Sequence, residues 1–199
     1  MIASKQIDLC RKTAINLLLA QEHLTFPIEP HTLQTGISIF YDSVQGYCHT
    51  VGLPISSFCC DQIIQDGCTI FSEDRSFYLI LYNEWDTSPA RRRFTLAHEL
   101  GHILLTHGDD SDQSERSANC FASELLIPRV CFSYFCQAGW KPSAKQISHF
   151  FGVSLTAARL ALKEPSNTLP SAGESALLDR IRSSLDLFLH SCLEPIITY

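Results

Sequence analysis

The pair His98 and His102 constrains the fold of this chain more than any other feature, because a spacing of four residues brings both side chains to one point when they lie on a helix. Ser88 and Pro89 are residue types preferred at a helix N-cap and first turn, and we expect a helix from there to about Thr106. Residues four apart on a helix lie on one face, roughly 6 Å apart along the axis. Both imidazoles can therefore reach a single Zn²⁺ at about 2.0–2.1 Å.

Glu99, which follows the first histidine, completes a His-Glu-x-x-His motif, the signature of zinc metalloproteases. Its carboxylate projects beside the imidazoles and can take a proton from metal-bound water, whose pKa the metal lowers towards about 7. The alternative is a solvated helix face that carries two unrelated histidines. A well-capped helix that follows a predicted strand argues against that alternative.

A catalytic zinc needs a third protein ligand, with one position left open for water. The longer motif with a glycine and a third histidine is excluded, because Leu105 and Gly108 stand at those two positions. An acidic residue from the following loop or from the next predicted helix, about 113–126, is the other common solution. The candidates are Glu115 and Glu124 in the helix and Asp109, Asp110 and Asp112 in the loop.

Glu115 is the preferred third ligand. It lies in the first turn of its predicted helix, on the same stripe as three residues that allow a close approach to the histidine-bearing helix: Ala118, Asn119 and Ala122. The alternative is structural, because Asp112-x-x-Glu115 resembles a capping box. Glu124 precedes an apolar run and is interpreted as a charge on the helix surface.

Two segments of the chain carry a family resemblance. Residues 92–102 read Arg-Arg-Phe-Thr-Leu-Ala-His-Glu-Leu-Gly-His. Residues 115–128 read Glu-x-x-Ala-Asn-x-Phe-Ala-x-Glu-Leu-Leu-Ile-Pro. Together they resemble the ImmA/IrrE family of metallopeptidases. The departures are Ser117, where a glutamate is common, and Ile127, where a methionine is common, and neither position is a metal ligand in the family pattern.

This resemblance implies a Zn²⁺ ion bound by His98, His102 and Glu115, with Glu99 as the general base. It also implies a biological role. Members of the family are regulatory proteases that cleave helix-turn-helix transcriptional repressors and so switch on mobile-element or stress-response genes, and some are linked to toxin–antitoxin systems. The expected partner is therefore a protein substrate of the repressor type, cut by a zinc-dependent endopeptidase.

The order of predicted elements indicates an α+β fold, in which a small β-sheet packs on a helical zinc-metallopeptidase core with additional C-terminal helices. Helices are expected over residues 4–21, 31–34, 88–106, 113–126, 128–139, 141–151, 154–163 and 174–193, and strands over 37–41, 49–51, 68–71 and 77–82. We expect three parts: a metallopeptidase domain over 1–139, a helix-turn-helix-like segment over 140–163, and a linker with an amphipathic helix over 164–199.

The strand over residues 77–82 is the last one before the metal-binding helix. We expect it to form the rim of the cleft, where an extended substrate can pair with its free edge by β-augmentation. Tyr82 and Asn83 would then lie near the scissile bond. The alternative is an ordinary sheet strand with a polar end.

Several residues are candidates for supporting roles. Candidate donors to a transition-state oxyanion are His107, Tyr82 and Arg93, although His107 is interpreted mainly as the end of the helix. The helix opens with three arginines, at positions 91–93, where its dipole disfavours cations, so we expect them to pair with acids elsewhere.

The segment 141–163 holds Lys141, Lys145, Arg159 and Lys163 and no acid, with the rhythm of a helix-turn-helix. A DNA-reading role would place Thr156 and Arg159 in the major groove. The alternative is a helical pair packed on the protease core, which the family resemblance and the net charge of −6 favour. A regulator that binds DNA or a partner protein around a structural zinc is the competing function.

The nine cysteines form no Cys-x-x-Cys pair and have no regular spacing. Such cysteines are typical of a reduced, cytoplasmic protein in which they pack as small hydrophobic residues. No apolar run approaches the roughly 18 residues that span a bilayer, so we expect no membrane partner. The oligomeric state is left open.

Overall fold

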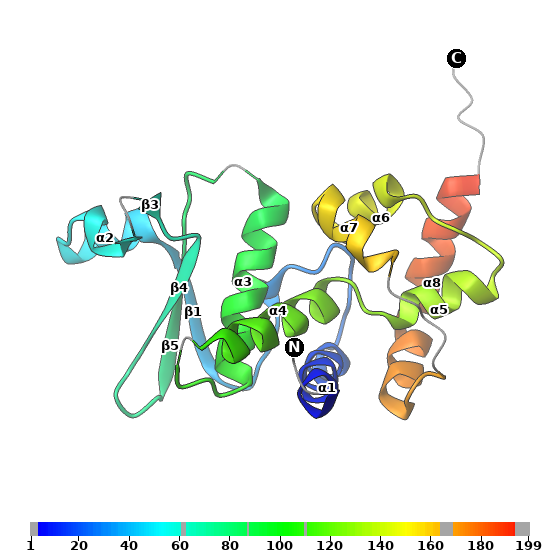
Figure 1. The fold of residues 1–199 in the computed structure, drawn as a ribbon, viewed down its shortest axis with the longest axis horizontal. Coiled ribbons are helices and arrows are strands. Elements are labelled where there is room, and N and C mark those ends of the chain that lie inside the picture. The colour runs from blue at the N-terminus through cyan, green and yellow to red at the C-terminus, as the bar shows by residue number, and fades with distance from the viewer. Residues whose placement is uncertain (1–3, 61–62, 87, 110, 164–168, 194–199) are drawn as a thin grey trace, which may run out of the picture.

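The computed structural model describes residues 4–60, 63–86, 88–109, 111–163 and 169–193, and the architecture is α+β. The α-helices are α1 Ser4–Ala20, α2 Val44–Val51, α3 Pro89–Leu104, α4 Asp112–Leu126, α5 Val130–Gln137, α6 Ala144–Phe151, α7 Leu155–Ala161 and α8 Ala172–Leu193. Two 3₁₀ turns are η1 Pro30–Thr32 and η2 Ile55–Phe58, and the strands are β1 Ser38–Ser43, β2 Cys59–Cys60, β3 Ile63–Ile64, β4 Gly67–Phe71 and β5 Phe77–Tyr82. Figure 1 shows the sheet at one end of the molecule and α5 to α8 at the other, with α3 and α4 between them.

The main sheet has three strands in the order β1-β5-β4. β5 runs parallel to β1, with Ser38 opposite Phe77, and antiparallel to β4, with Gly67 opposite Tyr82. The strands predicted over 68–71 and 77–82 are therefore confirmed, and they form a hairpin. The prediction that β5 offers a free edge is wrong, because β5 is the central strand and is paired on both sides. β4, the first strand of the hairpin, lies at one edge of the sheet.

The strand predicted over 49–51 is also wrong, since these residues end helix α2. The Ser43 side chain accepts a hydrogen bond from the Gly46 backbone N–H at the start of this helix, and Gly52 ends it in the left-handed conformation, with φ 72°. Val44 and Cys48, four residues apart, bury one face of the helix on the sheet against Leu81. The two caps and this apolar spacing outweigh the β-propensity of a single valine.

Helix α3 lies between the sheet and α4, and its predicted N-cap is confirmed, because the Ser88 side chain accepts a hydrogen bond from the Arg91 backbone N–H. The crossing of α3 and α4 is close. A Cβ atom added to Gly101 would lie 2.9 Å from Cδ1 of Phe121 and 3.2 Å from Cα of Ala118. The small residues of α4 therefore allow the close approach that the sequence predicts, and the first turn of α4 reaches the C-terminal half of α3.

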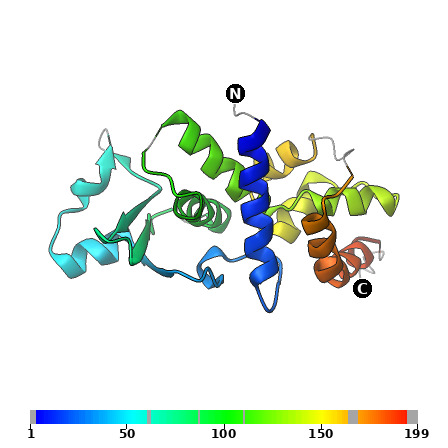
Figure 2. The ribbon, with the colours of Figure 1, turned by 90° about the horizontal axis from the view of Figure 1, so that it is seen from below.

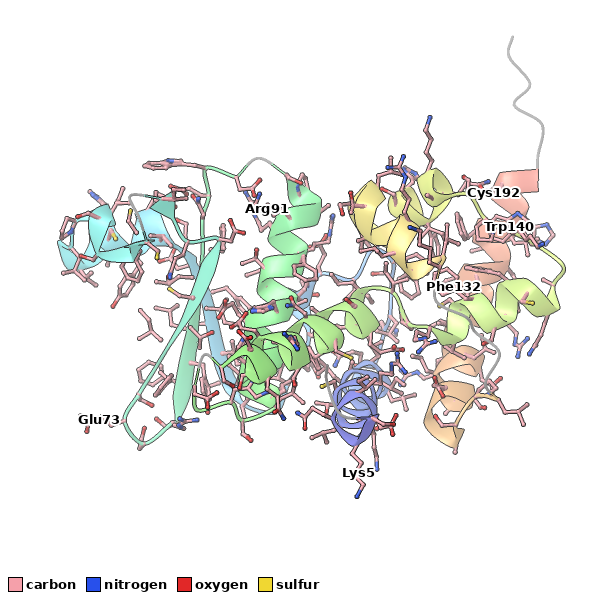
Figure 3. The ribbon with its side chains drawn as sticks, viewed as in Figure 1. Lys5, Glu73, Arg91, Phe132, Trp140 and Cys192 are labelled. Atoms are coloured by element: carbon pink, nitrogen blue, oxygen red, sulfur yellow. The ribbon has the colours of Figure 1, made fainter. Side chains whose placement is uncertain are left out.

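Helix α1 runs across the middle of the molecule and contacts both α4 and α8 (Figure 2). The hydrophobic core is continuous from α3 and α4 to the C-terminal helices, since Leu96, Phe121, Phe151 and Leu185 all belong to it. Beside α8, the Trp140 ring packs with its centroid 5.2 Å from that of Phe188 (Figure 3). The predicted division at residues 139 and 163 thus remains a prediction, and residues 164–168 of the predicted linker lie outside the described ranges.

Within the described part of the chain, no helix combines the length and the apolar character needed to cross a bilayer.

Candidate metal centre

The two histidines of the motif converge on one face of α3. Their Nε2 atoms lie 3.0 Å apart, and the side chains are only 16% and 15% exposed. Leu100 and Gly101, which lie between the two histidines in the sequence of α3, are buried. The one-turn spacing therefore places two nitrogen lone pairs at a single point, as the sequence predicts.

Glu115 brings a carboxylate to the same point from the first turn of α4. Its oxygens lie 3.3 Å from Nε2 of His98 and 3.3 Å from Nε2 of His102. The structural alternative for Glu115, a capping box with Asp112, is wrong, because α4 is capped by Ser111, whose side chain accepts a hydrogen bond from the Ser114 backbone N–H. The Glu115 carboxylate is turned towards the histidines instead.

The His-His-Glu cluster of His98, His102 and Glu115 has the donor set and the size of a metal site. One donor atom from each of the three residues can be chosen so that all lie within 4.8 Å of one another. Ligands about 2.0–2.1 Å from a tetrahedral zinc ion lie roughly 3.3 Å from each other, and the observed separations of 3.0 and 3.3 Å are close to this value. Two imidazoles and one carboxylate are also a donor set that catalytic zinc uses. The cluster therefore fits a metal ion without rearrangement of the helices.

Glu99 points from α3 towards the sheet. The hydroxyl of Thr69, on β4, donates a hydrogen bond of 2.7 Å to Oε2 of Glu99. β4 lies tightly over α3 at this point, because a Cβ atom on Gly67 would be 2.4 Å from Cγ2 of Thr95 and 3.5 Å from Cγ of Glu99. The glycine thus permits the close approach that brings the Thr69 hydroxyl to the carboxylate.

An open cavity of about 560 Å³ lies over this cluster. Its walls come from β4, β5, α3, the α3–α4 connection and the start of α4. The residues that line it include Gly67, Cys68, Thr69, Phe71, Tyr78, Glu99, His102, Ile103, His107 and Glu115. Glu99, His102 and Glu115 therefore face a space large enough for part of a peptide, and the wall opposite α4 is the edge strand β4.

The two inner nitrogens of the histidine pair also have partners. Nδ1 of His98 lies 3.1 Å from Oδ1 of Asn119, and Nδ1 of His102 lies 3.2 Å from Nδ1 of His107. Burial lowers the pKa of His107, so its neutral form is favoured. The sequence indicated Asn119 only as part of a close-packing stripe, and His107 mainly as a helix end and as one of three candidate oxyanion donors.

Tyr82 and Asn83 do not line the cavity. The guanidinium of Arg92 lies over the Tyr82 ring, 5.0 Å from its centroid. Oδ1 of Asn83 accepts hydrogen bonds from Nε2 of Gln45 at 2.8 Å and from the Trp85 backbone N–H at 3.0 Å. The idea that these two residues flank the scissile bond depended on a free edge of β5, and that premise is wrong.

The expectation that the arginines of α3 pair with acids is confirmed for two of them. Arg91, at the N-terminal end of α3 (Figure 3), lies 2.7 Å from the Asp66 carboxylate and 3.0 Å from that of Asp86. Arg93 lies 2.6 Å from Glu29, and its Nη1 donates to the carbonyl oxygen of Gly152. These contacts tie the start of α3 to its surroundings.

The interpretation of Glu124 as a surface charge is wrong. Its side chain is 3% exposed, because α1 covers the side of α4 that carries it. The carboxylate accepts a hydrogen bond of 3.0 Å from the Arg129 backbone N–H and lies 3.8 Å from Nε of Arg11. Burial raises the pKa of Glu124 to about 7. The residue is a structural acid outside the metal cluster.

Comparison with known families identifies the domain that carries this site. Residues 66–163 match the Peptidase_M78 model, described as the IrrE N-terminal-like domain. The match covers β4, β5, α3 and α4 and therefore every residue of the metal cluster and cavity named above. No curated protein matches the chain at a significant level. Residues 66–163 are therefore an IrrE-like domain of the Peptidase_M78 family, and this match supports a metallopeptidase-type function.

Proposed function

We propose that this protein is a zinc-dependent endopeptidase. The observation that carries the proposal is the convergence of His98, His102 and Glu115 at the edge of an open cavity that Glu99 also lines. A structural zinc is usually enclosed by four protein ligands. Among the described residues only three donors converge here, and the cavity leaves room for water and substrate.

Each residue of the site has a distinct task in this proposal. His98, His102 and Glu115 hold the zinc ion. When bound, zinc supplies Lewis acidity, which makes water nucleophilic near neutral pH and polarises a peptide carbonyl. Glu99 takes a proton from the attacking water and returns it to the leaving amine. The Thr69 hydroxyl, 2.7 Å from Oε2 of Glu99, holds the carboxylate in place for both transfers.

The edge strand β4 is the proposed docking site for the substrate. Among the described residues β4 pairs only with β5, and Gly67, Thr69 and Phe71 of this strand line the cavity. An extended peptide that adds to this edge by β-augmentation would run along the wall opposite the metal cluster. This proposal replaces the free edge of β5 with the free edge of β4.

The proposed physiological substrate is a helix-turn-helix transcriptional repressor. Support comes from the family match together with the two sequence segments that resemble the ImmA/IrrE metallopeptidases. All nine cysteines are free, in keeping with the proposed cytoplasmic setting. A repressor whose gene lies next to the gene for this protein is the first substrate to test.

The test compares wild type with Glu99→Gln, which keeps the shape of the side chain and removes the base. Zinc-loaded proteins are incubated with the candidate repressor, and fragments are followed by mass spectrometry. We expect Glu99→Gln to retain zinc and to cleave roughly 10²–10⁴-fold more slowly.

The matched control is Glu22→Gln, at a glutamate that is 85% exposed and follows α1, and it should cleave like wild type. Full cleavage by Glu99→Gln would rule out Glu99 as the base. A wild-type protein that holds zinc but cleaves neither the repressor nor unfolded proteins would overturn the proposed activity.

A further inference from the structure

The tautomers of the two histidines matter for metal binding. A neutral imidazole has one N–H group and one nitrogen with a free lone pair. The Nε2 atoms of His98 and His102 face each other at 3.0 Å and face the Glu115 carboxylate, so these are the atoms available to a metal. A histidine that binds through Nε2 carries its hydrogen on Nδ1, and that N–H needs an acceptor.

The acceptors come from two different segments. Oδ1 of Asn119, on α4, lies 3.1 Å from Nδ1 of His98. Nδ1 of His107, in the α3–α4 connection, lies 3.2 Å from Nδ1 of His102. We propose that His107 is a positioning residue, which accepts the Nδ1–H of His102 and so holds its Nε2 towards the metal. This inference rests on the proposed function, since it concerns the same metal centre.

The end of α3 places the His107 ring with two backbone hydrogen bonds. The His107 N–H donates to the carbonyl oxygen of His102 at 3.0 Å, and the Thr106 N–H donates to that of Ile103 at 3.1 Å. This pair of bonds, with Thr106 at φ 55°, is a Schellman motif. It usually has glycine at the left-handed position, and threonine there is strained. The His107 ring thus lies beside the His102 ring, with the two ring centroids 4.9 Å apart.

The second ring nitrogen of His107 makes no competing hydrogen bond within the described part of the chain. Its Nε2 atom is buried and has no hydrogen-bond partner among the residues that the structure describes. Within those residues, the hydrogen bond that orients the ring is therefore the one from His102 to Nδ1. An acceptor at Nδ1 requires the hydrogen of His107 to lie on Nε2, which defines one tautomer for each ring.

Zinc affinity of the full chain tests the proposal, measured by competition with a chromophoric chelator. His107→Phe keeps a ring and removes the acceptor, and we expect zinc to bind about 10–100-fold more weakly. His107→Asn can place its amide oxygen where Nδ1 lies, and it should restore affinity to within a few-fold of wild type. The matched control is His149→Phe, at an exposed position of α6, which should bind zinc like wild type.

A second measurement reads the tautomers in the wild-type protein and does not depend on a variant that folds. In zinc-loaded protein, ¹⁵N spectra of the histidine side chains should show the hydrogen of His102 on Nδ1 and that of His107 on Nε2. Wild-type zinc affinity in a folded His107→Phe protein, or a hydrogen on Nδ1 of His107, would overturn this inference alone. A wild-type chain that binds no zinc would overturn the proposed function as well.

Discussion

Two helix pairs in this chain, α3 with α4 and α6 with α7, are joined by short connections but make their closest contacts through different side chains. α3 and α4 meet over small residues, since Gly101 leaves no room for a Cβ atom beside Ala118 and Phe121. α6 and α7 meet around a glycine turn, and α6 packs on α8 through aromatic rings, with Phe150 stacked on Phe188 at a centroid distance of 4.1 Å. The first pair brings polar side chains of separate helices into one site. The second pair buries aromatic rings.

The difference shows how one continuous core can serve two purposes. Close backbone approach at α3 and α4 lets short polar side chains reach across the interface, as Asn119 reaches His98. Packing of large rings at the other end supplies apolar burial, which is the main source of stability. Substitutions in the two regions should therefore separate metal binding from stability.

The largest expected loss of stability is in the aromatic region. Phe151 is fully buried, with its ring centroid 5.1 Å from that of Phe26. Phe151→Ala should lower the free energy of unfolding by about 3–5 kcal/mol, measured by urea denaturation, because it leaves a cavity.

The folded fraction of Phe151→Ala should still bind zinc with wild-type affinity. Phe40→Ala is the control, at a ring that is 59% exposed, and it should change stability by less than about 1 kcal/mol. A folded Phe151→Ala protein that has lost zinc would show that the two regions are not separable.

A pH-dependent effect is expected at Glu124. Burial raises its pKa from 4.5 to about 7, so the folded chain binds this proton more tightly than the unfolded chain does. The stabilisation of the folded chain by protonation of Glu124 is fully present below about pH 4.5 and is lost as the pH rises to about 7. Thermal unfolding of metal-free protein across this range should show a flatter pH profile for Glu124→Gln than for wild type. An unchanged profile would contradict the assignment, and Glu22→Gln should keep the wild-type slope.

The smallest expected effect is at the end of α3. Gly152 ends α6 in the left-handed conformation with φ 63°, whereas α3 places Thr106 there with φ 55°. Thr106→Gly should therefore raise the free energy of unfolding by about 1 kcal/mol, because it removes this strain. Thr156→Gly, within α7, should lower stability instead, since glycine is a poor helix former. A destabilised Thr106→Gly protein would mean that the threonine is not strained.

The features that the sequence predicted well depend on neighbouring residues. The cap at Ser88 and the one-turn spacing of His98 and His102 are local, and both appear in the structure as expected. The stripe that includes Ala118 correctly predicted a close crossing of α3 and α4. The convergence of Glu115 with the histidines was also anticipated, although its role as a metal ligand stays a prediction.

The features that the sequence did not predict depend on distant segments or on backbone conformation. Glu124 is buried because α1, more than a hundred residues earlier, covers it. β5 is central because it pairs with β1, and in the sequence α2 and the small second sheet lie between these two strands. The contact of His107 with His102 requires a left-handed threonine, which residue preferences disfavour. None of these could be deduced from local spacing.

The zinc content of three proteins tests the central claim most directly. Wild type, Glu115→Ala and Glu124→Ala are prepared with excess zinc, dialysed, and analysed for metal and protein concentration. We predict about one zinc per chain in wild type and in Glu124→Ala, and little in Glu115→Ala, because only Glu115 is a ligand. Circular dichroism establishes that the variants are folded. No zinc in wild type, or zinc lost from Glu124→Ala and kept by Glu115→Ala, would contradict the account.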